Sequence, residues 1–288
     1  MRVWALLIGL IVISGCQIGP SPVSQPPQLV ETDWGIYPFA ENVSFSQVLQ
    51  LDYREADKTL SYGSDPLQFG KLWLPADTRV AAPLVIFIHG GCWLSDYDLS
   101  HSYAMATALA RAGFAVWSVE YRRTGDPGGG WPGSLHDVVQ AINYIQLQDN
   151  DAVDLQSVTL TGHSAGGHLA MLAEPQVARP ITNTLGLAPI IDIETYGQGQ
   201  NSCQRATHSF MGGTHAQRTA EYARANLLNA KLRGDVNILS GELDTIVPLP
   251  ANPLTDKAFR QVPGAGHFDW LHPGTPAFAV FIELLKNK

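Results

Sequence analysis

The chain has 288 residues, of which 45% are hydrophobic and 15% are charged, and its formal net charge is −8. This length and composition suit one large α/β domain or two small ones, and the low charged fraction argues against a long disordered region. A negatively charged chain without a run of basic residues is not expected to bind nucleic acid.

The first residues have the features of an export signal. Met1-Arg2 gives a positive start, and the apolar run from Val3 to Ile13 is too short to span a bilayer. Small residues follow in Ile13-Ser14-Gly15-Cys16, which resembles the lipobox of bacterial lipoproteins. We expect residues 1–15 to be a signal peptide and Cys16 to carry a lipid that anchors the protein in the cell envelope. A plain signal peptide that contains a cysteine is the alternative.

Two features refine the anchor. The residue after the cysteine is Gln17 and not an aspartate. By resemblance to the sorting rule of Gram-negative lipoproteins, this favours the outer membrane if the source is Gram-negative. Residues 16–33 are predicted to be a flexible tether, because Gln17 to Gln28 is rich in Pro, Ser and Gln. The folded domain is predicted to cover residues 34–288.

Strand and helix patterns alternate along this domain. Strands are predicted at Gln68–Leu74, Leu84–Ile88, Phe114–Tyr121, Val158–Thr161, Asn183–Ala188, Val236–Ser240 and Ala258–Val262. Helices are predicted at Ser100–Ala112, Leu135–Leu147, Ala165–Ala173 and Pro276–Leu285. This alternation predicts an α/β fold whose mostly parallel central sheet has helices on both faces.

One polar segment interrupts this rhythm. Residues 192–228 contain four glycines and no clear periodicity. We interpret the segment as a lid-like insertion over the carboxyl edge of the sheet, where such sheets bind ligands. A solvated connection without contact to substrate is the alternative.

The sequence Gly162-His163-Ser164-Ala165-Gly166 matches the pattern Gly-x-Ser-x-Gly. It lies between a predicted buried strand and a predicted helix. A nucleophilic serine on such a sharp turn needs small residues two positions away on either side. The turn also places the backbone N–H of Ala165 beside a reacting carbonyl, at a helix N-terminus that favours negative charge. Ser164 is therefore the candidate nucleophile.

An acyl-transfer serine also needs a base and a carboxylate that orients it. Asp244 directly follows a predicted strand, and Glu242 is its rival. His267 follows the last predicted strand in a glycine-rich loop, and His272, next to a proline, is the rival base. Their positions in the loops after the predicted strands favour Asp244 and His267. The order Ser164, Asp244, His267 along the chain is also the order expected when the serine lies on a strand–turn–helix turn.

Backbone donors for an oxyanion are suggested by His89-Gly90-Gly91-Cys92-Trp93, directly after a predicted strand. Cys92 is rejected as a second nucleophile because no adjacent base is evident. Cys92 and Cys203 are able to pair, but their spacing does not require a disulfide. No His-Glu-x-x-His motif or zinc-like spacing occurs, so neither a metal nor a cofactor is expected.

Taken together, these motifs resemble the α/β-hydrolase superfamily. The His-Gly-Gly-x-Trp form, Tyr121-Arg122, Trp131-Pro132 and Gly-His-Ser-Ala-Gly-Gly-His resemble the branch with acetyl- and feruloyl-type esterases and kynurenine formamidases. The resemblance runs from about Tyr62 to the C-terminus. It implies Ser164 as nucleophile, Asp244 as acid and His267 as base, with oxyanion donors at Gly91, Cys92 and Ala165.

The predicted function is a serine carboxylesterase that cleaves a small-molecule ester through an acyl-enzyme. An arylformamidase acting on an N-formyl amide is the runner-up. A non-catalytic envelope binding protein that keeps the fold is the alternative from another class. The acyl and alcohol groups and the oligomeric state are not predicted by the sequence.

Overall fold

The computed structural model describes residues 28–148, 150–181, 183–249, 254 and 257–287. Its strands are β1 (Leu29–Thr32), β2 (Gly35–Pro38), β3 (Lys58–Ser61), β4 (Phe69–Trp73), β5 (Ala82–Ile88), β6 (Ala115–Val119), β7 (Val153–His163), β8 (Asn183–Leu187), β9 (Asp235–Gly241) and β10 (Ala258–Val262). The α-helices are α1 (Phe45–Leu49), α2 (Tyr103–Arg111), α3 (Gly133–Ile145), α4 (Ala165–Ala173), α5 (Ile193–Tyr196), α6 (Ser202–Met211), α7 (Thr219–Ala225) and α8 (Pro276–Lys286). Short 3-10 helices are η1 (Leu99–Ser102), η2 (Glu174–Gln176), η3 (Leu227–Asn229) and η4 (Asp269–Leu271).

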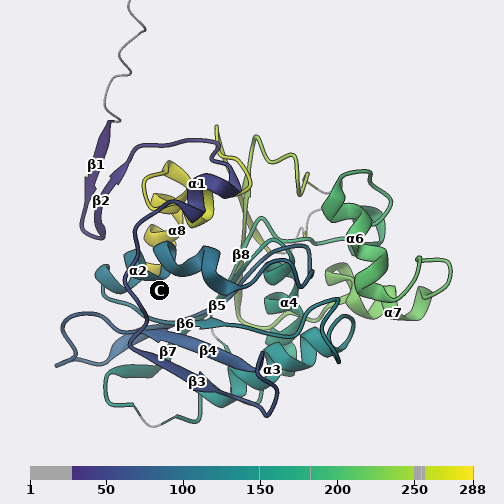
Figure 1. Ribbon diagram of the computed structural model, residues 1–288, viewed down its shortest axis with the longest axis horizontal. Helices are drawn as coiled ribbons and strands as arrows, with labels where there is room; N and C mark the ends of the chain where they lie inside the picture. Colours follow the sequence, from purple (N-terminus) through teal and green to yellow (C-terminus); the bar gives the residue numbers. More distant parts are fainter. Residues whose placement is uncertain (1–27, 149, 182, 250–253, 255–256, 288) are drawn as a thin grey trace, which may run out of the picture.

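The main body is an eight-stranded sheet in the order β10-β9-β8-β7-β5-β6-β4-β3 (Figure 1). The strands from β10 to β6 in this order are parallel. β4 is antiparallel to β6, and β3 is antiparallel to β4. A separate antiparallel hairpin of β1 and β2 lies at the N-terminal side of the molecule (Figure 1).

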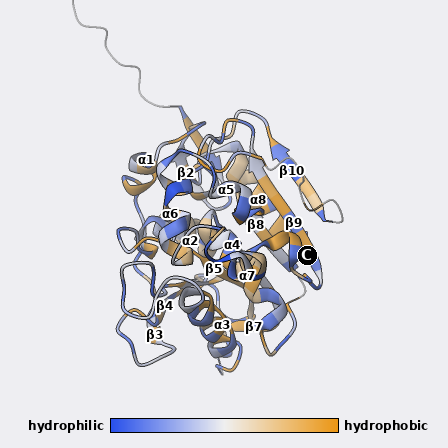
Figure 2. Ribbon diagram, turned by 90° about the vertical axis from the view of Figure 1, so that its right-hand side faces the viewer, coloured by the Kyte–Doolittle hydropathy of each residue, from blue (hydrophilic) through white to orange (hydrophobic). Residues whose placement is uncertain are grey.

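The central strands are apolar on both faces because both faces are covered by helices. Side chains alternate along a strand, so Leu84, Ile86 and Ile88 of β5 enter one core while Val85 and Phe87 enter the other. A buried parallel strand therefore reads as a continuous apolar run, which is why β5 was recognisable from its sequence. β9 is mixed instead: Val236, Ile238 and Leu239 are buried, Asp235 at its start is exposed, and Figure 2 colours much of the strand as hydrophobic.

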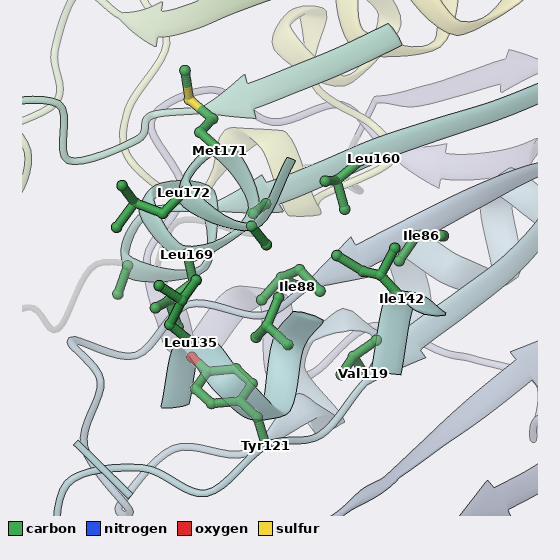
Figure 3. Close-up of a cluster of buried hydrophobic side chains, with 14 of the residues drawn as sticks. Ile86, Ile88, Val119, Tyr121, Leu135, Ile142, Leu160, Leu169, Met171 and Leu172 are labelled. Atoms are coloured by element: carbon green, nitrogen blue, oxygen red, sulfur yellow. The ribbon is translucent and has the colours of Figure 1, made fainter. Parts of the chain in front are cut away.

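The first core lies between the sheet and the helices α3 and α4. Ile86 and Ile88 pack there with Leu135 and Ile142 of α3 and with Leu169 of α4 (Figure 3). The apolar residues of α3 recur at helical spacing, so one face of the helix is buried against the sheet. This packing fixes α4, whose first residue follows Ser164.

The second core lies on the other face, under α2, α8 and the N-terminal segment. The Trp34 ring packs against Phe278 of α8 with ring centroids 6.0 Å apart, and its indole N–H donates to the Pro273 carbonyl at 3.0 Å. The N-terminal segment is therefore fixed to the C-terminal part of the chain.

The structure confirms the α/β architecture and every predicted strand and helix of the sheet region, with α4 and β10 at the predicted bounds. It adds the β1–β2 hairpin, α1 and β3, which the sequence patterns did not predict. β1 begins at Leu29, within the stretch interpreted as a tether, because the hairpin is held through Trp34. The predicted signal peptide and Cys16 lie outside the described residues.

Residues 192–228 form a packed helical segment. They contain α5, α6, α7 and η3, which Figure 1 places together beside the sheet. Cys203, Phe210 and Tyr222 from these helices are buried in the same core as α3 and α4. In the part of the chain that is described, no helix is long and apolar enough to cross a membrane.

Candidate active site

Ser164 occupies the turn between β7 and α4. Its backbone has φ 57° and ψ −123°, and its N–H donates to the Leu187 carbonyl at 2.8 Å. A side chain on Gly162 would collide with the Gly166 carbonyl, and one on Gly166 would collide with the Ile88 carbonyl. The glycines of the motif are therefore required by the close approach of three backbone segments, as the sharp turn predicts.

Asp244 and His267 come together at the neighbouring strand ends. Asp244 follows β9, His267 follows β10, and Asp244 Oδ2 lies 2.7 Å from His267 Nδ1. Asp244 Oδ1 accepts the N–H groups of Ile246 and Val247 at 2.9 and 2.8 Å. The carboxylate is thereby fixed by its own loop, and the Asp244 carboxylate selects the tautomer that carries its proton on Nδ1. His267 Nε2 is left to accept a proton from a hydroxyl.

The two rival residues have other partners. Glu242 is exposed, and its carboxylate accepts the N–H of Gly264 at 3.0 Å. His272 Nδ1 accepts the N–H of Gly274 at 3.1 Å, and burial lowers the pKa of His272. Neither lines the cavity that contains Ser164.

Ser164 and His267 line one cavity of about 160 Å³. The other lining residues are Phe45, Gly91, Cys92, Tyr97, His101, His163, Asn201, Ser202, Cys203, Ile246 and Phe268. A larger hollow of about 890 Å³ lies near the amino ends of the strands, where Ala82 begins β5, and it contains none of the predicted site residues. The candidate reaction centre is therefore the smaller cavity at the carboxyl edge, the place where parallel sheets bind ligands.

The loop after β5 brings its backbone to this cavity in an unusual conformation. Gly91, Cys92 and Trp93 have φ values of 110°, 55° and 59°. Gly91 and Cys92 line the cavity, and Ala165 begins α4 directly after Ser164. Within the described ranges, the N–H groups of Gly91, Cys92 and Ala165 have no hydrogen-bond acceptor. They are thus available to an oxyanion.

His89 fixes the start of this loop. Its ring lies between two acceptors, with Nδ1 2.7 Å from the Gly90 carbonyl and Nε2 3.0 Å from Glu120 Oε1. Tyr121 stacks on the ring and donates its hydroxyl to the His89 carbonyl at 2.9 Å. The histidine of the His-Gly-Gly motif is therefore a structural anchor rather than a reacting group.

Cys92 and Cys203 form a disulfide, with Cα atoms 5.1 Å apart. The sequence left this pairing open, because the two residues are 111 positions apart and no spacing rule connects them. The bond excludes Cys92 as a free thiol nucleophile. It also joins the loop of the proposed oxyanion donors to α6 of the insertion.

Two histidines beside the nucleophile bridge distant segments. His163 Nε2 donates to the His267 carbonyl at 2.8 Å, and His168 Nε2 donates to the Ala225 carbonyl at 2.7 Å. Burial is the largest cause that holds the pKa of His163 well below its usual value, and the electrostatic effect of nearby His267 is the second. His163 is therefore neutral at neutral pH, and its ring orients the loop of the candidate base.

Sequence reasoning missed the aromatic wall of the cavity. The Phe45 ring centroid lies 5.6 Å from that of Tyr97 and 5.5 Å from those of His101 and Phe268. Burial, then the charge of His89, lowers the pKa of His101 to about 3, so this imidazole is uncharged. Phe45 comes from a five-residue helix far upstream, for which the sequence offered no periodic signal.

A family model places this chain among known proteins. Residues 71–256 match the family described as BD-FAE, which is more than half of the chain. The chain belongs to the BD-FAE family. The matched region holds Ser164 and Asp244, whereas Phe45 and His267 lie outside it.

Relatives of this BD-FAE family member include named esterases. Esterase LipC of Mycobacterium tuberculosis is 27% identical over 257 residues, covering 77% of this chain and 63% of LipC. A kynurenine formamidase of Meyerozyma guilliermondii is 29% identical over 116 residues, covering 40% of this chain and 42% of that protein. The chain thus spans less than two thirds of the length of both relatives.

Solved structures share the fold. Esterase B from Lactobacillus rhamnosis superposes with a TM-score of 0.69 at 21% identity, covering 84% of this chain and 88% of that chain. A bacterial heroin esterase superposes with a TM-score of 0.66 at 19% identity, covering 84% and 86%. These likenesses confirm the α/β-hydrolase fold of this chain.

Proposed function

We propose that this BD-FAE family member is a serine carboxylesterase in which Ser164, His267 and Asp244 form the catalytic triad. The observation that carries the proposal is the 2.7 Å contact between His267 Nδ1 and Asp244 Oδ2, with His267 and Ser164 lining one cavity. Kinship with named esterases supports ester hydrolysis as the reaction.

The proposed reaction uses each group in turn. His267 Nε2 takes the proton of the Ser164 hydroxyl as Oγ attacks the ester carbonyl, and Asp244 stabilises the imidazolium that forms. The N–H groups of Gly91, Cys92 and Ala165 hold the negative oxygen. His267 then protonates the leaving alcohol, and in the second half it activates the water that releases the acid.

The cavity supports a substrate with a small apolar group beside the reacting carbonyl. Its volume of about 160 Å³ is near the roughly 150 Å³ of an apolar cavity that admits benzene. The wall formed by Phe45, Tyr97 and Phe268 is aromatic. We therefore propose a short acyl chain or a single ring as the group that enters.

Arylformamidase activity is the second candidate, because one relative is a kynurenine formamidase. The same serine and oxyanion donors serve an N-formyl amide. p-Nitrophenyl esters of increasing acyl length, assayed beside N-formylkynurenine, separate the two activities.

The test of the proposed nucleophile is Ser164→Ala. Esterase turnover is expected to fall by roughly 10⁴-fold or more, because triad members act as a unit. Labelling by a fluorophosphonate probe should disappear as well. Ser202→Ala is the matched control: it removes another hydroxyl of the same cavity and should still be labelled. Wild-type protein that is neither labelled nor active on any ester would support the non-catalytic binding protein instead.

The location of the enzyme is a separate proposal. We propose that it is exported and anchored in the cell envelope through lipidated Cys16. The Cys92–Cys203 disulfide supports export, because such bonds persist in oxidising compartments.

A further inference from the structure

We propose that the Cys92–Cys203 disulfide is a positioning element of the active site, which holds the oxyanion donors in place through α6. This inference rests on the proposed esterase function and assigns part of it to the insertion. In this view residues 192–228 do not merely cover the cavity. They set the geometry of the loop that faces Ser164.

The loop needs an external restraint because of its backbone. Gly91, Cys92 and Trp93 are three consecutive residues with positive φ. Glycine adopts this conformation freely, but residues with a Cβ atom are disfavoured there and keep it only where their surroundings fix it. Cys92 and Trp93 therefore each require a fixed partner.

Both residues have a partner on the same helix, α6. Cys92 is bonded to Cys203 in the first turn of α6. The Trp93 ring stacks on Phe210 in the last turn, with ring centroids 4.5 Å apart and an interplanar angle of 10°. Trp93, Cys203 and Phe210 are all buried. The first turn of α6 thus holds Cys92, and its last turn holds Trp93.

α6 is in turn attached to the rest of the site. The Asn201 side chain caps the helix by accepting the N–H of Gln204 at 2.8 Å, and its amide donates to the Ile246 carbonyl at 3.0 Å. Ile246 belongs to the loop whose N–H groups fix Asp244. At the other end, the Phe210 carbonyl accepts the N–H of Trp131 at 2.8 Å. The helix therefore links the oxyanion loop to the loop of the catalytic carboxylate.

The competing explanation is that the disulfide only stabilises the fold, because a disulfide that closes a long loop restricts the unfolded chain. The two explanations differ in what the bond does to folded enzyme. If the disulfide only stabilises the fold, its removal changes the melting temperature and leaves kcat unchanged in molecules that remain folded. A positioning element changes the stabilisation of the tetrahedral intermediate, even when the melting temperature permits full folding.

The experiment compares Cys203→Ser with Ser209→Ala, an exposed position on the same helix. We expect Cys203→Ser to lower kcat by between about tenfold and 10³-fold, since removal of one oxyanion donor typically costs 10²–10³. The inhibition constant of an alkyl boronic acid, which forms a tetrahedral adduct on the serine, should rise by a similar factor. KM should change less than threefold, and Ser209→Ala should match wild type in all three quantities.

Reduction of folded wild-type enzyme provides a second arm that does not depend on the variant folding. Tris(2-carboxyethyl)phosphine supplies two electrons from its phosphorus and becomes the phosphine oxide. Water supplies the oxygen of that oxide and the two protons, so the disulfide becomes two thiols. Reduced wild type, verified by thiol titration, should reproduce the loss of kcat. Cys203→Ser should not respond to the reductant.

The outcomes are distinct. If Cys203→Ser or the reduced enzyme has wild-type kcat at a temperature where circular dichroism shows it folded, the positioning role is wrong and the disulfide only stabilises the fold. If wild-type protein is not labelled by a fluorophosphonate, the proposed esterase function fails instead. Loss of kcat without any change in boronic acid affinity also overturns the inference, because the donors would then be intact.

Discussion

The two oxygens of Asp244 have separate partners. Oδ1 accepts two backbone N–H groups and Oδ2 accepts His267 Nδ1–H, so the carboxylate has one orientation. In Asp244→Asn the backbone N–H groups select the amide oxygen at the first position, and the amide NH₂ then faces His267. The imidazole must present a lone pair at Nδ1 and a proton at Nε2, which is the wrong tautomer for accepting the serine proton.

We therefore expect Asp244→Asn to lower kcat by roughly 10⁴-fold, the size of the effect when a triad aspartate becomes asparagine. Circular dichroism should show a folded protein. Glu242→Gln is the matched control, because Glu242 is exposed and its carboxylate accepts the N–H of Gly264. It should change kcat by less than tenfold. The opposite ranking of the two variants would move the acid to Glu242.

The site residues that the sequence predicted are those that a local pattern in the chain marks. Ser164 is recognisable because a sharp turn demands glycines at fixed positions, and Asp244 because it directly follows a strand. Phe45 and the pairing of Cys92 with Cys203 were not predictable. Each depends on contacts between segments far apart in the chain, and no local pattern records them.

At the scale of elements, the predictable strands are those buried on both faces. β5 and β6 read as apolar runs because helices cover them, whereas β1 and β3 are four-residue strands without a buried residue. α6 could have been found: Asn201 and Gln204 form a capping box, and Gly212 ends the helix in the left-handed conformation. The polar composition of the insertion hid these signals.

The short helix α1 carries Phe45, which lines the cavity. Its N-terminal side is anchored by Asp269, whose buried carboxylate accepts the N–H groups of Asn42 and Val43 at 2.9 and 2.8 Å. Asp269 lies two residues after His267, so the N-terminal segment and the loop of the proposed base are joined. The helix thereby holds Phe45 in the wall of the cavity.

Phe45→Ala should enlarge the cavity without touching the reacting groups. We expect the ratio of kcat/KM for p-nitrophenyl octanoate to that for p-nitrophenyl acetate to rise by roughly tenfold, because each methylene in an apolar pocket contributes about 1–3 kcal/mol. Leu49→Ala, on the same helix but 50% exposed, is the control and should leave the ratio unchanged. An unchanged ratio in Phe45→Ala would remove this residue from the acyl pocket.

At the scale of the whole molecule, the two cores divide the functional parts. Helix α4, which follows the proposed nucleophile, and the insertion belong to the core on one face, and the N-terminal segment belongs to the core on the other. Figure 1 shows the β1–β2 hairpin, where the described chain begins, on the side of the molecule away from α6 and α7. The described chain thus begins on the side of the molecule opposite the insertion.

The proposed anchor gives the last prediction. Lipid modification of Cys16 adds two or three acyl chains, and two chains suffice for stable attachment whereas one gives only marginal binding. Full-length wild-type protein should therefore sediment with membranes and be released by detergent but not by high salt, because the attachment is apolar. Cys16→Ser should be recovered in the soluble fraction with its esterase activity retained. Cys203→Ser, which removes a different cysteine, should still sediment. Mass spectrometry of the mature N-terminus decides the matter: it should begin at an acylated Cys16, and an unmodified terminus at any other residue would show that the export signal is a plain signal peptide.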